Sequence, residues 1–261
     1  MQIPYFHIDA FTDRCFSGNP AGVCPLEAWL PDEMLQAMAA EHQQAETAFT
    51  VKDQGGGYSL RWFTPTMEMD LCGHATLAAA HALWRHGYES GHELTFLTRS
   101  GSLNVTQEND LLIMNFPART ARRIEPPPEV EEILSGSPLS CWRSRDYLFE
   151  FKDEAAVRAL RPDLARLAAW NDVLGVIVTA PGREVDFVSR FFAPRAGIPE
   201  DRVTGSAHCT LIPFWSERLG KKSLRARQVS PRGGEIFCEA LGERVKIAGR
   251  ATTYLKGTIE I

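Results

Sequence analysis

An internal repeat constrains this chain more than any other feature of its sequence. The segment SLRWFTP (59–65) leads to LCGHATLAAAHALWRHG (71–87), and FVSRFFAP (187–194) leads to VTGSAHCTLIPFWSERLG (203–220). In each copy an aromatic-rich strand ends at Arg-aromatic-Phe-x-Pro, and a glycine then opens a helical stretch that closes on a second glycine. Two related units in one chain usually place a shared site between them. The repeat therefore predicts two similar halves with a common cleft.

The other patterns are those of an α+β protein. The segment ARTARRIEPPP (118–128) is rich in charge and proline, which favours an extended connection between domains. We expect one half at 1–117 and the other at 118–261, with a last strand that can return to the first half. Pro213 should make the second repeat helix kink or start late, because it removes a backbone hydrogen bond. Helices are expected at 31–42, 127–134 and 153–169, and strands at 46–51, 58–64, 93–100, 102–116, 174–180 and 185–193.

Composition excludes several kinds of partner. The chain has 261 residues, 23% of them charged, and a net charge of −5 with scattered Lys and Arg, so no surface for nucleic acid is expected. Its apolar runs are too short to span a membrane, and no signal peptide pattern opens it. Six cysteines stand singly and neither CxxC nor HExxH occurs, so we expect a cytoplasmic protein without a bound metal.

Glu46 is the strongest candidate for a catalytic residue. It follows a predicted helix and begins the apolar run TAFTV, which would place its carboxylate at the rim of a nonpolar region. A carboxyl group in such a setting suits a residue that both takes and returns a proton. The alternative is an exposed glutamate at a strand end with no role. Asp201 could tune or share the proton, or act only as a solvated loop acid or helix cap.

The two glycine turns of the repeat are candidate anion sites. Gly73-His74 and Gly205-Ser206 open helices, whose first N–H groups have no internal partner and point outward. A carboxylate or a developing enolate could bind there, with His74 and Ser206 as further donors. The alternative is that the glycines only permit tight turns.

Cys72 raises a rival mechanism. Racemases that use two thiols need a cysteine on each side of the substrate carbon, but the repeat position that matches Cys72 is Thr204. A threonine hydroxyl cannot replace a thiol near pH 7. We therefore interpret Cys72 as a small buried residue.

Five segments spread over essentially the whole chain carry a family resemblance. They are FHIDAFTDRCFSGNPAGVCPL (6–26), QQAETAFT (43–50), RWFTPTMEMDLCGHATLAAAHAL (61–83), FFAPRAGIPEDRVTGSAHC (191–209) and VKIAGRATTYLKGTIEI (245–261). Together they resemble the phenazine-biosynthesis PhzF-like family. The resemblance implies two halves with the diaminopimelate epimerase fold, each a β-barrel-like sheet around a central helix, with the site in the interdomain cleft and no metal or organic cofactor.

The resemblance also implies site residues and a reaction. The proton-transferring glutamate of that family falls on Glu46, its glycine-histidine on Gly73 and His74, and its acidic residue with the following glycine and serine on Asp201, Gly205 and Ser206. The family's characterised reaction isomerises a dihydro-hydroxyanthranilate by moving a proton between ring carbons. Many members have a small or apolar residue where this chain has Cys72, and relatives commonly form homodimers.

The leading hypothesis is a cofactor-independent isomerase that acts on a small carboxylated substrate through Glu46. A racemase or epimerase assisted by Cys72 is the second enzyme hypothesis. The third is a noncatalytic module that binds a small ligand or a protein, for which the acid/base residues would be dispensable.

Overall fold

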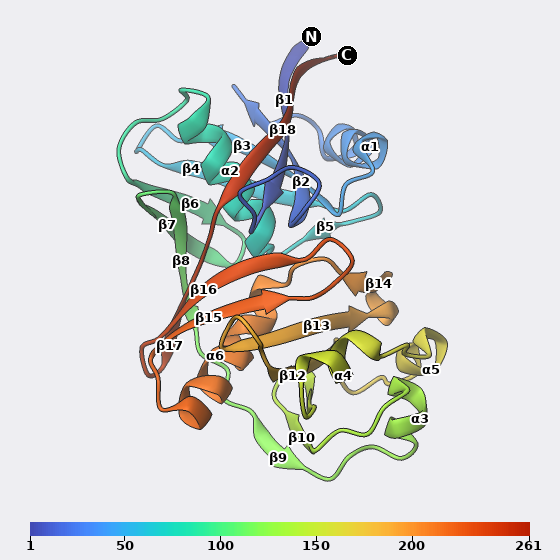
Figure 1. Ribbon diagram of the computed structural model, residues 1–261. Coiled ribbons are helices and arrows are strands. Elements are labelled where there is room, and N and C mark those ends of the chain that lie inside the picture. The colour runs from blue at the N-terminus through green and yellow to red at the C-terminus, as the bar shows by residue number, and fades with distance from the viewer. The chain divides into compact units, whose positions relative to one another are not determined.

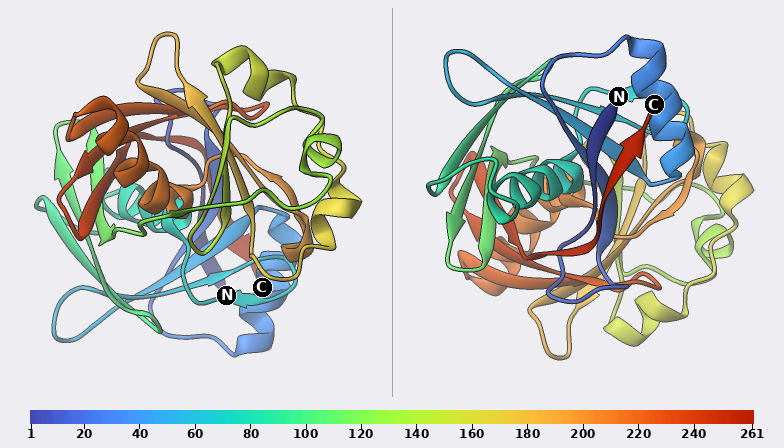
Figure 2. Two further views of the ribbon diagram at one scale, coloured as in Figure 1. Left: turned by 90° about the horizontal axis from the view of Figure 1, so that it is seen from below. Right: turned by 90° about the horizontal axis from the view of Figure 1, so that it is seen from above.

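The chain begins and ends in neighbouring strands. In the computed structural model, which describes residues 1–261, β1 (Gln2–Ala10) pairs antiparallel with β18 (Ala251–Glu260). The two termini consequently lie next to each other (Figures 1 and 2). The chain forms two compact units, Met1–Asn115 with Ala248–Ile261 and Phe116–Ile247. The last strand thus belongs to the same unit as the first.

The first unit is a sheet with a buried helix. Strand β2 pairs antiparallel with β1 and parallel with β3, and β4 pairs antiparallel with β3 and β5 and parallel with β6. Strands β6, β7 and β8 continue as antiparallel neighbours. The elements are β2 (Asn19–Leu26), α1 (Asp32–His42), β3 (Glu46–Lys52), β4 (Tyr58–Phe63), β5 (Glu68–Met69), α2 (Gly73–Arg85), β6 (Glu93–Thr98), β7 (Gly101–Glu108) and β8 (Leu111–Pro117).

Helix α2 is the core helix of this unit. Its sequence GHATLAAAHALWR is rich in alanine, the best helix former, and the small side chains let the helix approach the sheet closely. It packs against β1, β2 and β3, and residues 74–80 are all buried. A helix that is apolar nearly all round is stable only inside a core. This packing fixes the position of the helix start at Gly73.

The second unit repeats the pattern of strand pairings. Strands β11, β12, β13, β15 and β16 pair in the same parallel and antiparallel order as β2, β3, β4, β6 and β7. The elements are β9 (Arg122–Ile124), α3 (Val130–Leu134), β10 (Ser140–Arg143), β11 (Tyr147–Glu150), α4 (Glu154–Ala159), α5 (Leu164–Ala168), β12 (Val176–Pro181), β13 (Phe187–Ala193), β14 (Ile198–Asp201), α6 (Gly205–Leu219), β15 (Ser223–Gln228), β16 (Gly234–Ala240) and β17 (Arg244–Gly249). The chain is therefore an α+β protein of two similar halves, as the repeat predicts.

The helices of the second unit differ from the prediction in two places. The pattern at 153–169 is not one helix but α4 and α5, since Pro162 stands between them and cannot donate a backbone hydrogen bond. The predicted late start of the second repeat helix is wrong, because α6 runs from Gly205 with Pro213 inside it. Pro213 leaves the carbonyl of Cys209 without its helical donor, and the backbone N–H of Arg119 donates to that carbonyl at 2.8 Å. The freed acceptor is thus satisfied.

An arginine–glutamate ion pair precedes each glycine turn. In the first unit, Arg61 of β4 binds both carboxylate oxygens of Glu68 in β5, at 2.7 and 2.8 Å. In the second unit, Arg190 of β13 binds both oxygens of Glu200 in β14, at 2.7 and 3.0 Å. Such two-point pairs are strong and directional. Each holds the short strand that leads into the turn, so the repeated arginine has the same structural role in both halves.

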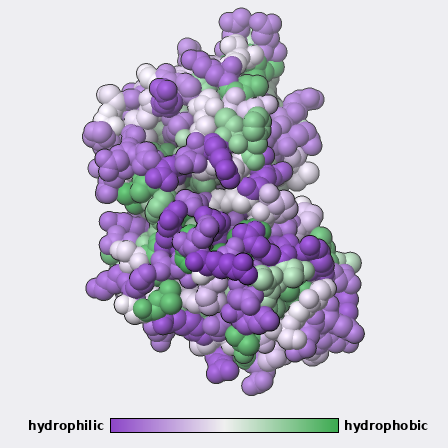
Figure 3. Space-filling view, in the orientation of Figure 1, coloured by the Kyte–Doolittle hydropathy of each residue, from purple (hydrophilic) through white to green (hydrophobic).

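None of the helices combines the length and the apolar character needed to cross a membrane. The face drawn in Figure 3 is mostly hydrophilic, with hydrophobic residues in small groups. The large apolar side chains lie instead in the interior of the units, for example Trp62, Phe149 and Phe187.

Candidate functional site

Glu46 is the first residue of β3 and is buried. Helix α1 ends at His42, Gln43 adopts a left-handed conformation (φ 51°), and the chain turns into β3 three residues later. Parallel pairing with β2 sets Glu46 opposite Ala21. Only 7% of Glu46 is exposed, so its carboxylate needs a partner inside the protein.

That partner is His74, the second residue of α2. Its Nε2 lies 3.1 Å from Oε2 of Glu46, and His74 is itself only 7% exposed. The two atoms are close but not aligned as a hydrogen bond, and neither has another hydrogen-bond partner. Two buried polar atoms with unused capacity are uncommon in folded proteins, and they often mark a functional site.

The charge state of His74 follows from its neighbours. Burial acts to lower the pKa of His74, but Cys72 and Glu46 outweigh burial and hold this pKa well above its usual value. Burial also raises the pKa of the Cys72 thiol. The Glu46 carboxylate, whose Oε2 lies 3.1 Å from Nε2 of His74, also favours protonated His74.

Cys72 caps the same helix. It lies at the N-terminal flank of α2, is 6% exposed, and its Sγ lies 3.5 Å from Nδ1 of His74. Its carbonyl accepts hydrogen bonds from the backbone N–H and the hydroxyl of Thr76, which fixes the first turn of the helix. Cys72 is buried, as expected, and it contacts a predicted site residue.

Gly73 lies between Cys72 and His74 without any steric need for glycine. Its φ is not in the left-handed region, and a Cβ at this position would meet no atom within 4 Å. The explanation that this glycine only permits a tight turn therefore lacks support. The space on the Cβ side of Gly73 is open, which leaves that side of the helix start unobstructed by other side chains.

Asp201, Gly205 and Ser206 form a second group, in the other unit. Asp201 ends β14, and its Oδ2 accepts a hydrogen bond from the hydroxyl of Thr204 at 2.6 Å. Gly205 opens α6, with Thr204 at the N-terminal flank of the helix. The Oγ of Ser206 accepts a hydrogen bond from Arg145 at 3.2 Å. The structure thus gathers the predicted residues into two groups, one at each repeated turn.

Sequence reasoning missed Gln228 and Arg145. The buried Gln228 side chain accepts the N–H of Thr204 and donates to the carbonyl of Asp201, both at 2.8 Å, so it holds the second turn in place. Gln228 lies at the end of β15, where only strand pairing reveals its role. Arg145 lies in the loop after β10, and no motif in its surroundings points to a site.

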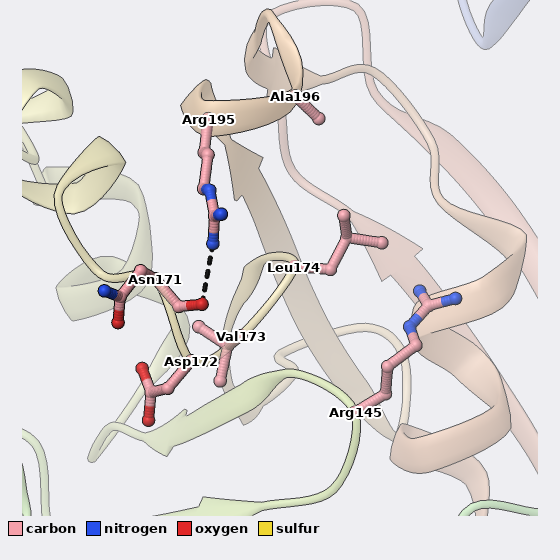
Figure 4. Close-up of a pocket in the computed structure, with 7 residues that line it drawn as sticks. All are labelled: Arg145, Asn171, Asp172, Val173, Leu174, Arg195 and Ala196. Carbon is pink, nitrogen blue, oxygen red and sulfur yellow. Dashed lines mark hydrogen bonds between the residues drawn. The ribbon is translucent and has the colours of Figure 1, made fainter.

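Arg145 also borders a pocket in the second unit. The pocket has a volume of about 470 Å³. Figure 4 shows that Arg145 and Arg195 reach it from different segments, and Arg195 donates to the carbonyl of Asn171 at 2.7 Å. Its lining residues are Arg145, Asn171, Asp172, Val173, Leu174, Arg195 and Ala196.

Comparisons with known proteins agree with this architecture. The family model described as "Phenazine biosynthesis-like protein" matches residues 8–257. An uncharacterized isomerase of Pseudomonas aeruginosa is 50% identical, with 100% of both chains covered. A crystal structure of a PhzF family protein from Enterococcus faecalis matches with a TM-score of 0.97 at 46% identity, again over 100% of both chains. A hydroxyproline epimerase from Agrobacterium vitis shares the fold, with a TM-score of 0.63 at 11% identity over 99% of this chain and 92% of the other.

The fold and the comparisons define an isomerase. The chain belongs to the phenazine biosynthesis-like PhzF family, and the predicted fold of two diaminopimelate epimerase-like halves is confirmed.

Proposed function

We propose that this isomerase moves a proton on a small carboxylated substrate, with Glu46 as the general acid/base and no cofactor. The substrate class is a cyclic or unsaturated amino or hydroxy acid. The observation that carries the proposal is the buried Glu46–His74 pair at the open start of α2, with 3.1 Å between Oε2 and Nε2. A carboxyl group held this way can take a proton from carbon and return it.

The proton transfer needs only one carboxyl group. The ionised Glu46 removes a proton from a carbon next to an unsaturated group, and the electron pair of the broken C–H bond moves into the conjugated system. The protonated Glu46, whose carboxyl proton exchanges with solvent, then returns a proton to another carbon of that system, which shifts the double bond and restores the carboxylate. Protonated His74 stabilises ionised Glu46 at the start and the end of this cycle.

The helix starts suit the substrate's negative charge. The first N–H groups of α2, beginning at Gly73, would bind a carboxylate or the developing enolate, and the open space at Gly73 supports this role. In the other unit, Gly205 and Ser206 at the start of α6 would bind a substrate carboxylate in the same way. Asp201 would tune protonation near that turn through its hydrogen bond with Thr204.

A Cys72-assisted epimerase is the second candidate. The 3.5 Å contact between Sγ of Cys72 and Nδ1 of His74 favours it. Two observations count against it: burial raises the pKa of this thiol, and Thr204 occupies the matching repeat position, so a second thiol is missing there. This candidate predicts activity that is lost in Cys72→Ser and kept in Glu46→Gln.

Isotope exchange tests the proposal. Wild type and Glu46→Gln are incubated in deuterated water with a panel of unsaturated and cyclic amino and hydroxy acids, and mass spectrometry follows deuterium uptake and product. Glu46→Gln should cut turnover by at least ~100-fold, the lower end for lost general acid/base catalysis. Glu41→Gln, at an exposed glutamate in α1, is the matched control and should match wild type. Turnover of Glu46→Gln within a factor of a few of wild type would refute the proposal.

A further inference from the structure

Three buried side chains near the start of α2 carry the ligand atoms that zinc prefers. Glu46, Cys72 and His74 offer one oxygen, one sulfur and one nitrogen, and the three atoms lie within 4.8 Å of one another. Each residue is at most 7% exposed. Structural and catalytic zinc sites use these same ligand types. Sequence spacing could not reveal this set, because Glu46 comes from a different segment than the Cys-x-His pair.

The separations are close to those of a zinc centre. Ligand atoms around a tetrahedral Zn²⁺ lie about 3.3–3.6 Å apart, given bond lengths of roughly 2.0–2.3 Å. The observed distances are 3.5 Å from Sγ of Cys72 to Nδ1 of His74 and 3.1 Å from Nε2 of His74 to Oε2 of Glu46. One ion takes one ring nitrogen, and the three ligand atoms lie within 4.8 Å of one another. Either the thiol or the carboxylate must therefore move by up to about 1.5 Å for all three to bind.

Charge and ligand type also suit a soft divalent ion. Binding of the ion releases the thiol proton of Cys72 and the ring proton of His74 to solvent. The resulting thiolate and the carboxylate together balance the charge of Zn²⁺, which makes the centre neutral in its buried setting. The sulfur ligand favours zinc over magnesium or calcium. Two of the ligand groups, Oε2 of Glu46 and Nε2 of His74, have no hydrogen-bond partner that the ion would have to displace.

We propose that Glu46, Cys72 and His74 form a binding site for Zn²⁺ and that the bound ion inhibits the enzyme. The inhibition rests on the proposed function, since the ion would occupy the carboxylate that transfers the proton. The binding itself does not rest on it. Cys72 is then the residue that makes this proton-transfer site sensitive to thiophilic metals.

Cobalt is the probe that reads the ligands directly. Chelator-treated protein is titrated with Co²⁺, and its absorption is recorded. The expected result is one equivalent bound, with tetrahedral cobalt bands and a thiolate-to-cobalt charge-transfer band in the near ultraviolet, both abolished by excess Zn²⁺. Absence of the charge-transfer band in wild type overturns the proposal without reference to any variant.

Variants assign the sulfur ligand. Cys72→Ala should remove the charge-transfer band and weaken Zn²⁺ binding, measured by competition with a chromophoric chelator, by at least ~100-fold. Cys209→Ala and Cys141→Ala remove other buried cysteines and should keep both signals. Glu46→Gln should keep the charge-transfer band but weaken binding, and circular dichroism checks the fold of each variant. A band that persists in Cys72→Ala, or vanishes in Cys209→Ala, overturns the assignment.

The inhibition is measured separately by deuterium exchange. Micromolar Zn²⁺ should stop exchange in wild type. The Zn²⁺ concentration that halves the exchange rate should be at least ~10-fold higher in Cys72→Ala. The two proposals fail differently, because cobalt spectra report binding even when no substrate is turned over. Zinc that binds but leaves exchange unchanged would overturn the inhibitory part alone.

Discussion

Replacing Arg190 by methionine tests the role of the repeated arginine. Its guanidinium binds both oxygens of Glu200 and donates a further hydrogen bond to each of two carbonyls, those of Val157 and Leu160, at 3.1 and 3.0 Å. The side chains of Arg190 and Glu200 are only 10% and 19% exposed. Arg190→Met keeps much of the apolar stem but leaves a largely buried carboxylate and two carbonyls without this donor.

The matched variant is Arg61→Met in the other unit. Arg61 pairs with Glu68 in the same two-point manner, but Glu68 also binds Arg99 at 2.7 Å. Loss of Arg61 therefore leaves the carboxylate paired. Breaking a buried pair by removing one partner costs about 3–5 kcal/mol, and a pair that retains a second cation should cost about 1–2 kcal/mol. We expect Arg190→Met to lose at least about 1 kcal/mol more than Arg61→Met.

Urea unfolding followed by hydrogen exchange and mass spectrometry measures both variants. Exchange is needed because two compact units need not unfold in a single transition. The amides of β13 and β14 should lose protection in Arg190→Met, and those of β4 and β5 in Arg61→Met. Equal losses of unfolding free energy in the two variants, or a loss under about 1 kcal/mol for Arg190→Met, would refute the reasoning.

Three further predictions concern single residues near the repeat helices. Burial lowers the pKa of His208 to about 4, so between about pH 6.5 and pH 4 the unfolded chain takes up this proton and the folded chain does not. Stability should fall from pH 6.5 toward pH 4, and His208→Gln should reduce the slope of unfolding free energy against pH by up to about 1.4 kcal/mol per unit. Gly73→Ala should keep the melting temperature within about 2 °C of wild type, because the added Cβ meets open space. The same variant should weaken substrate binding, measured by calorimetry, at least ~10-fold. Pro213→Ala should raise the unfolding free energy, measured by urea unfolding, by under about 1 kcal/mol. An ordinary proline in a helix interior costs ~3 kcal/mol relative to alanine, but here the carbonyl of Cys209 already accepts a hydrogen bond.

The repeat and the local patterns determined much of the fold. The motif Arg-aromatic-Phe-x-Pro followed by a glycine helix start predicted two similar halves. The strand predicted at 46–51, before the glycine turn at 55–57, is observed as Glu46–Lys52. These features depend on residues that are close together in the sequence, so the sequence alone predicts them. Pro162 is also local, yet the helical pattern around it hid the break between α4 and α5.

Only the tertiary structure decided which side chains meet. Glu46 and His74 come into contact because α2 packs on the sheet that contains β3. Gln228 reaches the second turn because β15 pairs with β13. The Glu46–Cys72–His74 cluster combines two segments that are far apart in the sequence. No zinc-binding motif in the sequence could therefore have indicated it. Contacts of this kind depend on strand register and helix packing, which long-range burial sets and which no local run of residues encodes.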